Sequence, residues 1–207
     1  MSRDFISDIA FTPSVKAQQE QRGSRGGYQK MAERGDWQST VGEDLKAFLL
    51  ERNSFYLGTA AKDGQPYIQH RGGPRGFLKV IDENTLGFAD FAGNRQYISI
   101  GNLAENAKAY IFLMDYENRR RVKVWGRMEA VEGDEALVEK LMVQGYRARP
   151  ERAFLFKVEA WDTNCPQHIP VKLDVDIVEA EMNKLKARIK ALELELADRK
   201  NRPKPLD

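Results

Sequence analysis

The chain has 207 residues, of which 42% are hydrophobic and 10% aromatic, enough for the packed core of one domain with extensions. Its formal net charge of only +2 excludes the strong positive field of a nucleic-acid-binding protein. No apolar run approaches the roughly 20 residues of a membrane span, and the first residues lack a signal-peptide apolar region. We therefore expect no membrane association and a cytoplasmic location. One cysteine and two histidines give no paired metal-ligand spacing, so we expect no metal.

Residues 1–38 combine a helix start with a glycine-rich stretch. Thr12 followed by Pro13 has the cap and the first-turn proline that are typical of a short helix. Residues 22–27 lack the preceding strand and the full spacing of a nucleotide-binding loop, and they predict a connector. We expect a helical lead-in and connector before the main domain.

The main domain should begin with a helix and continue as strands. Thr40 and Glu43 have the spacing of a capping box and precede an apolar helical face. Asn94 is placed to cap an inserted helix that begins at Arg95, and a second inserted helix precedes the last strand. The β-rich runs, separated by turn residues, predict strands at 55–60, 66–71, 77–81, 86–90, 110–114, 121–131 and 152–161. This pattern indicates an antiparallel barrel with helical insertions.

Two tryptophans lie on the charged faces of the two long strands. Strict alternation places Trp125 beside Lys123, opposite the apolar face of its strand. Trp161 likewise shares a face with Lys157 and Glu159. Such residues either cover a helix and edge the barrel, or mark a subunit or ligand surface. Two of them together favour the second interpretation.

Residues 171–207 predict an amphipathic helix and tail. Its apolar residues alternate spacings of three and four, which forms a heptad seam of Val175, Val178, Met182, Leu185, Ile189, Leu192 and Leu196. A parallel pair of helices would bring opposite charges together at Glu181 and Lys186, Arg188 and Glu193, and Glu195 and Lys200. The pattern is consistent with a parallel homodimeric coiled coil. The alternative is a helix that lies on its own barrel.

Six short motifs along the chain are informative together. They are QPYIQHRGGP at 65–74, GFLKV at 76–80, GFADF at 87–91, GNRQYIS at 93–99, EAWD at 159–162 and NCPQHIP at 164–170. They resemble the pyridoxamine 5'-phosphate oxidase-like FMN-binding split-barrel family, and within it a bacterial branch of unassigned chemistry. The similarity covers about residues 11–170. It implies a mainly β (α+β) fold, a six-stranded antiparallel Greek-key split barrel at residues 39–170, with FMN at the interface of a homodimer.

The resemblance places the flavin phosphate at two points of the sequence. In the oxidases a strand arginine meets the phosphate, and Arg71 matches it. The turn formed by Asn94, Arg95 and Gln96 matches the further phosphate contacts. A dianion favours a bidentate guanidinium and the positive end of a helix. The alternatives are a surface ion pair for Arg71 and a solvated helix residue for Arg95.

The resemblance also implies contacts around the flavin ring. Gln69 and His70 should run beneath the isoalloxazine, and Lys79 is an approximate match to a lysine of the next strand. Trp161 matches the tryptophan that packs at the ring from the partner subunit. His168 is the candidate catalytic proton donor or acceptor, whereas a structural role is the alternative for His70. The expected cofactor-binding set is completed by Asp90, Phe91, Trp125 and Gln167.

These features predict an FMN-dependent oxidoreductase that acts on an unknown small substrate. Two departures argue against efficient oxidation of pyridoxamine 5'-phosphate: Gln167 stands where the oxidases carry an arginine, and residues 72–75 interrupt the family pattern. One alternative is a non-catalytic flavin carrier or redox sensor that signals through the C-terminal helix. Another is a haem-binding barrel with His70 or His168 as axial ligand.

Overall fold

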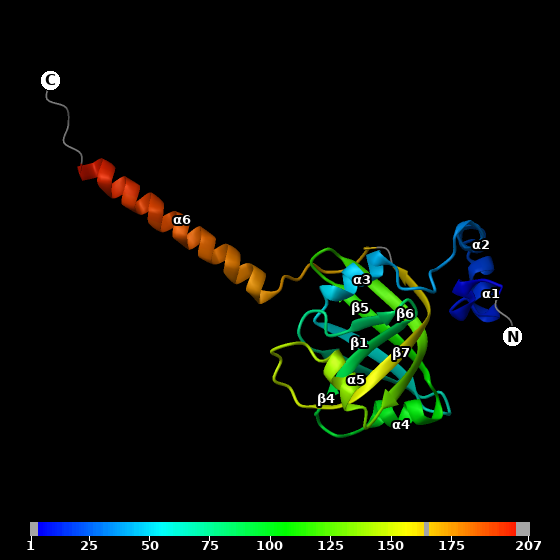
Figure 1. Cartoon of the computed structure of the whole chain (residues 1–207). Coiled ribbons are helices and arrows are strands. Elements are labelled where there is room, and N and C mark those ends of the chain that lie inside the picture. Colours follow the sequence, from blue (N-terminus) through cyan, green and yellow to red (C-terminus); the bar gives the residue numbers. More distant parts are fainter. Residues whose placement is uncertain (1–3, 164–165, 202–207) are drawn as a thin grey trace.

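One antiparallel β-sheet curls around the core of the protein, and Figure 1 shows its strands wrapping into a barrel. The computed structural model describes residues 4–163 and 166–201. The seven strands follow the order β2-β1-β5-β6-β7-β4-β3. They are β1 Ser54–Ala60, β2 Pro66–Gly72, β3 Lys79–Asp82, β4 Thr85–Phe91, β5 Lys108–Asp115, β6 Arg120–Val131 and β7 Pro150–Thr163.

The predicted α+β class with an antiparallel sheet is confirmed, but the count of six strands is wrong. Every run that the sequence predicted to be a strand overlaps one. The run at 77–81 becomes the short edge strand β3, which folds back on β4 and gains a ladder on one side. This hairpin makes the total seven.

Phenylalanine rings fill the centre of the barrel. The Phe88 ring stacks on Phe154 with 5.3 Å between centroids and meets the edge of Phe55 at 5.2 Å. These three rings come from β4, β7 and β1, so the core ties together both sides of the curled sheet. The predicted inward faces of the two long strands are confirmed, because the buried set includes Val122, Val124, Met128, Phe154, Phe156, Val158 and Ala160.

The N-terminal residues form two α-helices where one helix and a connector were predicted. Thr12 caps α1, Pro13–Gln21, as expected, since its Oγ1 accepts a hydrogen bond of 3.4 Å from the backbone N of Val15. The connector at 22–27 is wrong, because α2, Arg25–Arg34, begins inside it. The Arg25 guanidinium donates to Gln19 Oε1 at 3.0 Å, which holds the start of α2 against α1.

The segment before the barrel also differs from its prediction. Helix α3, Glu43–Leu50, has Gly42 at its N-cap and no side-chain cap, so the capping box from Thr40 is wrong. The carbonyl of Thr40 instead accepts a hydrogen bond of 2.7 Å from the indole Nε1 of Trp161. The tertiary contact with β7 therefore determines the conformation of this segment. The remaining helices are η1 Ile6–Ile9, α4 Ile98–Glu105, α5 Glu135–Leu141 and α6 Val175–Asn201.

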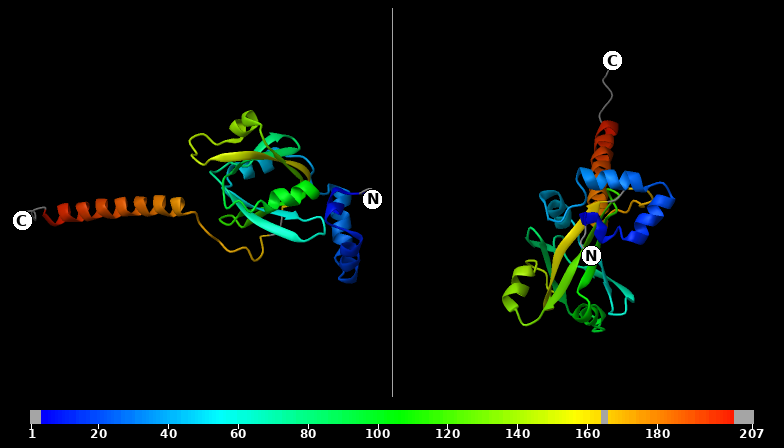
Figure 2. Two further views of the ribbon diagram at one scale, coloured as in Figure 1. Left: turned by 90° about the horizontal axis from the view of Figure 1, so that it is seen from below. Right: turned by 90° about the vertical axis from the view of Figure 1, so that its right-hand side faces the viewer.

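The two ends of the chain leave the barrel on different sides. Figures 1 and 2 show α1 and α2 beside the barrel and α6 extending away from the opposite side. The alternative interpretation, in which α6 lies on its own barrel, is therefore wrong. Among the described residues, no helix combines the length and the apolar character that crossing a membrane would require.

Gly126 permits the close approach of β6 and β7 at a register shift between Trp125 and Gly126. A Cβ atom at Gly126 would overlap the Lys157 carbonyl and the Phe156 ring. We expect Gly126→Ala to lower the free energy of unfolding by about 1–3 kcal/mol, as overpacking of a core does, measured by urea titration. Gly101→Ala is the control, because nothing lies within 4 Å of that position in α4. Equal stability of the two variants would contradict this account.

Candidate functional site

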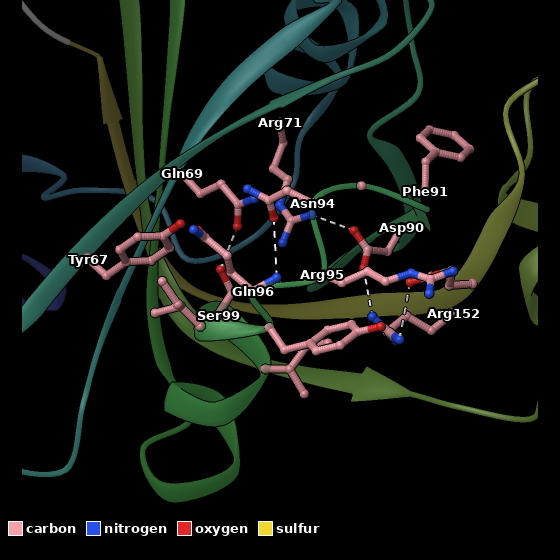
Figure 3. A pocket seen from close by; sticks show the side chains of 15 residues that line it. Tyr67, Gln69, Arg71, Asp90, Phe91, Asn94, Arg95, Gln96, Ser99 and Arg152 are labelled. Carbon is pink, nitrogen blue, oxygen red and sulfur yellow. Dashed lines mark hydrogen bonds and ion pairs between the residues drawn. The ribbon is translucent and has the colours of Figure 1, made fainter.

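A cavity of about 240 Å³ opens at the end of the barrel, and Figure 3 shows its lining. The lining comes from β2, β4, the loop at 92–97, the first turn of α4 and the start of β7. Several residues that the sequence singled out for cofactor binding lie together here: Gln69, Arg71, Asp90, Phe91, Asn94, Arg95 and Gln96. Segments far apart in sequence thus meet at one site.

Alternation along β2 decides which of its side chains enter the cavity. Gln69 and Arg71 share the face that turns toward the loop before α4 (Figure 3). Gln69 is held there, because its Oε1 accepts a hydrogen bond of 2.9 Å from Ser99 Oγ. His70 lies on the opposite, exposed face, where its ring meets the edge of Tyr56 at 5.8 Å between centroids. The imidazole of His70 therefore does not line the cavity.

A buried carboxylate joins two arginines at the centre of the site. Asp90 is only 6% exposed and accepts hydrogen bonds from Nη1 of Arg71 and, at 3.2 Å, from Nη1 of Arg152. Burial raises the pKa of the Asp90 carboxyl, and the positive charges of Arg71 and Arg152 act against this shift. The guanidinium of Arg71 also lies 5.3 Å from the Phe154 ring centroid, and that of Arg152 lies 5.4 Å from the Tyr97 ring centroid. Both arginines are therefore held by an anion and an aromatic ring.

The loop before α4 has a defined turn. Asn94 Oδ1 accepts a hydrogen bond of 3.3 Å from the backbone N of Gln96, and Arg95 and Tyr97 have left-handed φ angles of 59° and 54°. These angles are incompatible with a continuous α-helix, so the predicted helix start at Arg95 is wrong and α4 begins at Ile98. Turns with left-handed residues can direct successive backbone N–H groups toward an anion.

The site retains positive donors that a phosphate could use. The Arg71 guanidinium carries five N–H groups, and its Nη1 donates to Asp90. The lining also carries more arginine than carboxylate, with Arg71, Arg95 and Arg152 against Asp90 and Glu151. These donors fit the phosphate group of FMN.

The remaining predicted residues lie outside this cavity. Lys79 Nζ donates to the carbonyls of Lys140 at 2.8 Å and Met142 at 2.7 Å, and burial lowers the pKa of its ammonium. Its two carbonyl contacts attach β3 to the end of α5 and the residue that follows it. Gln167 and His168 are exposed, on the segment between β7 and α6.

The two strand tryptophans are covered by the segment that precedes α3. Trp37 stacks on Trp125 with 4.7 Å between ring centroids, and Phe11 packs on Trp37 at 5.2 Å. Trp161 pairs through its backbone with Gln38 at 2.7 and 3.2 Å. Contacts within one chain thus account for the position of Trp125, and neither tryptophan lines the cavity.

Arg152 is the charged member of the central cluster that the sequence-based reasoning missed. It has the same parity as Phe154 and Phe156 in β7, so it lies on the inward face of that strand. A charged residue on an otherwise apolar face was the available signal. Its partner could not be inferred, because Asp90 precedes it by 62 residues.

The sequence profile of the family described as pyridoxamine 5'-phosphate oxidase matches residues 41–165, more than half of the chain. The chain belongs to this family. Similar solved structures include HupZ from Group A Streptococcus, with 21% identity over 64% of this chain and 99% of that chain and a TM-score of 0.48. An FMN-binding protein from Syntrophomonas wolfei has 14% identity over 70% and 97% of the two chains, with a TM-score of 0.46. HutZ, a heme storage protein from Vibrio cholerae, has 16% identity over 60% and 93%, with a TM-score of 0.40. No curated protein matches the sequence.

Removal of the Asp90 charge should destabilise this member of the family. Asp90→Asn leaves the half-buried Arg71 without a counter-ion among the described residues, whereas Arg152 keeps ion pairs with Glu132 and Glu151. We expect a loss of about 3 kcal/mol in the free energy of unfolding, measured by urea titration of flavin-free protein. Glu129→Gln, an exposed charge change on β6, is the control and should have little effect. Equal stability of both variants would show that Asp90 does not hold the cluster.

Proposed function

We propose that this protein binds FMN and acts as a flavin-dependent oxidoreductase on a small substrate. The observation that carries the proposal is the group of arginine and loop donors at the end of the barrel. Family membership supports the choice of FMN among phosphorylated ligands. Bound flavin would supply hydride and electron transfer, and the protein would supply position and electrostatics.

The phosphate-binding role is assigned to Arg71, Arg95 and the loop. Arg71 keeps its Asp90 contact through one N–H and has further N–H groups for phosphate oxygens. Asn94 maintains the turn through its bond to Gln96, which presents the backbone N–H groups of the loop. Gln69, fixed by Ser99, offers an amide that can bind the polar edge of a flavin ring.

A second copy of the chain would complete the site. One chain provides about 240 Å³, whereas pockets for ligands of this size class usually measure about 300–1,000 Å³. Part of the cofactor would therefore extend beyond the one-chain cavity. We assign Trp161, Gln167 and His168 of the partner subunit to this outer part, with His168 as the proton donor or acceptor. The exposure of Gln167 and His168 is compatible with such a role.

Non-catalytic flavin carriage or redox sensing is the second candidate function. The exposed helix α6, which extends away from the barrel, favours it (Figure 1). The two functions differ in steady turnover. The sensor function would be favoured if the FMN-loaded dimer neither reduced nor oxidised a small substrate and instead bound a partner protein in only one redox state of the flavin.

The phosphate site should depend on two arginines. We expect Arg71→Ala combined with Arg95→Ala to strip FMN from the purified protein, since each charge-assisted hydrogen bond contributes about 1.5–3 kcal/mol. The measurement is the visible absorption spectrum with a flavin titration, and circular dichroism checks the fold. Arg127→Ala, at an exposed position on β6, is the matched control. Stoichiometric FMN in the double variant would refute the assignment, and a Soret band in the unaltered protein would replace flavin by haem.

Pyridoxamine 5'-phosphate should be a poor substrate. Gln167 is a neutral amide and cannot compensate a phosphate charge as a guanidinium does. Loss of one charged contact alone weakens binding roughly ten- to a hundredfold. The assay is aerobic formation of pyridoxal 5'-phosphate by FMN-saturated protein. A kcat/KM of about 10⁴ M⁻¹s⁻¹ or more would restore the oxidase interpretation.

A further inference from the structure

The apolar seam of α6 is exposed along its described length. Its seven members keep between 39% and 67% of their surface accessible, and α6 extends away from the barrel in both Figure 1 and Figure 2. The members are Val175, Val178, Met182, Leu185, Ile189, Leu192 and Leu196. A helix with such a stripe is stable in water when the stripe packs against another surface. The spacing of three and four is that of the a and d positions of a coiled coil.

We propose that α6 pairs in parallel with α6 of a second copy of this chain. In a parallel pair, a residue at position g faces position e of the following heptad in the other helix. Glu181 would then face Lys186 of the second copy, and Arg188 would face Glu193. Each contact joins opposite charges, and each occurs twice in a symmetric dimer.

The antiparallel register that leaves Val175 without a partner layer brings together charges of the same sign. In that arrangement g faces g and e faces e, so Glu181 meets Glu195, Glu179 meets Glu193 and Arg188 meets Arg188 of the other helix. A shift by one heptad makes these contacts attractive but leaves Leu196 without a partner layer. Charge pattern and seam coverage together therefore select the parallel arrangement.

Contacts near the start of α6 attach the helix to the barrel. This attachment determines at which end of a helix pair the two barrels would lie. The Asp174 carbonyl accepts hydrogen bonds from the backbone N of Ile177 at 3.1 Å and of Val178 at 3.3 Å. The Asp174 carboxylate pairs with the Arg75 guanidinium, and this pair neutralises the one acidic g position that would face another acid. Two parallel helices about 40 Å long would thus carry both barrels at the same end of the pair.

This inference concerns a surface outside the cofactor cavity and does not depend on FMN. If the barrels also associate, pairing of α6 becomes intramolecular and gains from the high effective concentration. Leu194 is exposed but lies outside the seam, so it takes no part in the pairing.

Single cysteines on α6, in a Cys165→Ser background of the full chain, test the arrangement. Val178 occupies position d, so the two copies of Val178→Cys lie close enough for a disulfide in a parallel pair. Ala180 is at position f, on the outside of the pair, and Ala180→Cys is the matched control. We expect oxidation to convert the single-chain band of Val178→Cys into a disulfide-linked dimer, with no such loss for Ala180→Cys.

The orientation is decided by a mixture of variants. In either antiparallel arrangement the two Val178→Cys residues are at least about 16 Å apart along the axis and cannot form a disulfide. Crosslinks that appear only when Val178→Cys is mixed with Leu196→Cys or Ile189→Cys would overturn the proposal. The proposal would also be overturned if Val178→Cys formed no more disulfide-linked dimer than Ala180→Cys.

Discussion

The ion pair between Arg71 and Asp90 connects two strands that are not neighbours in the sheet. Arg71 lies on β2, at one edge of the strand order, and Asp90 lies on β4, beside the other edge strand. The curled sheet has no backbone ladder between these strands, so side chains hold the opening at this end. Arg152, directly opposite Asp90 in the β4–β7 register, extends the same cluster into the barrel wall. The shape of the candidate site depends on this cluster.

A buried carboxylate in the proposed anion-binding site has a physical role that net charge alone would obscure. Asp90 and a phosphate repel each other, but Asp90 restricts the orientation of Arg71 and so reduces the entropy that binding would otherwise cost. A guanidinium can serve both anions at once, because its five N–H groups point in different directions. The raised pKa of Asp90 reflects how strongly its burial opposes the charge that the arginines favour. The site is therefore preorganised at an energetic cost.

The extensions at the two ends of the chain relate to the barrel in different ways. The N-terminal segment packs closely, through Phe11, Trp37 and Trp125, and covers an outer aromatic surface of β6. Helix α6 is attached only near its start and leaves its apolar seam in solvent. The first extension completes the surface of one chain, whereas the second presents a surface whose complement is another helix. The buried aromatic side chains of the N-terminal extension thus stabilise one chain, whereas the exposed heptad seam of α6 is suited to contact with a second helix.

Local patterns in the sequence determined the strands, the inward faces of β6 and β7 and the heptad seam of α6, because each depends on a period of two, three or four residues. Family resemblance added Arg71 and the loop after β4. Only the tertiary structure decided that Thr40 receives an indole N–H in place of capping α3, that α4 begins at Ile98, and that Arg152 belongs to the site. Each of these features depends on a partner far away in the chain. Sequence periodicity describes a residue's own segment, whereas hydrogen bonds and ion pairs between segments are selected by the packing of the whole barrel.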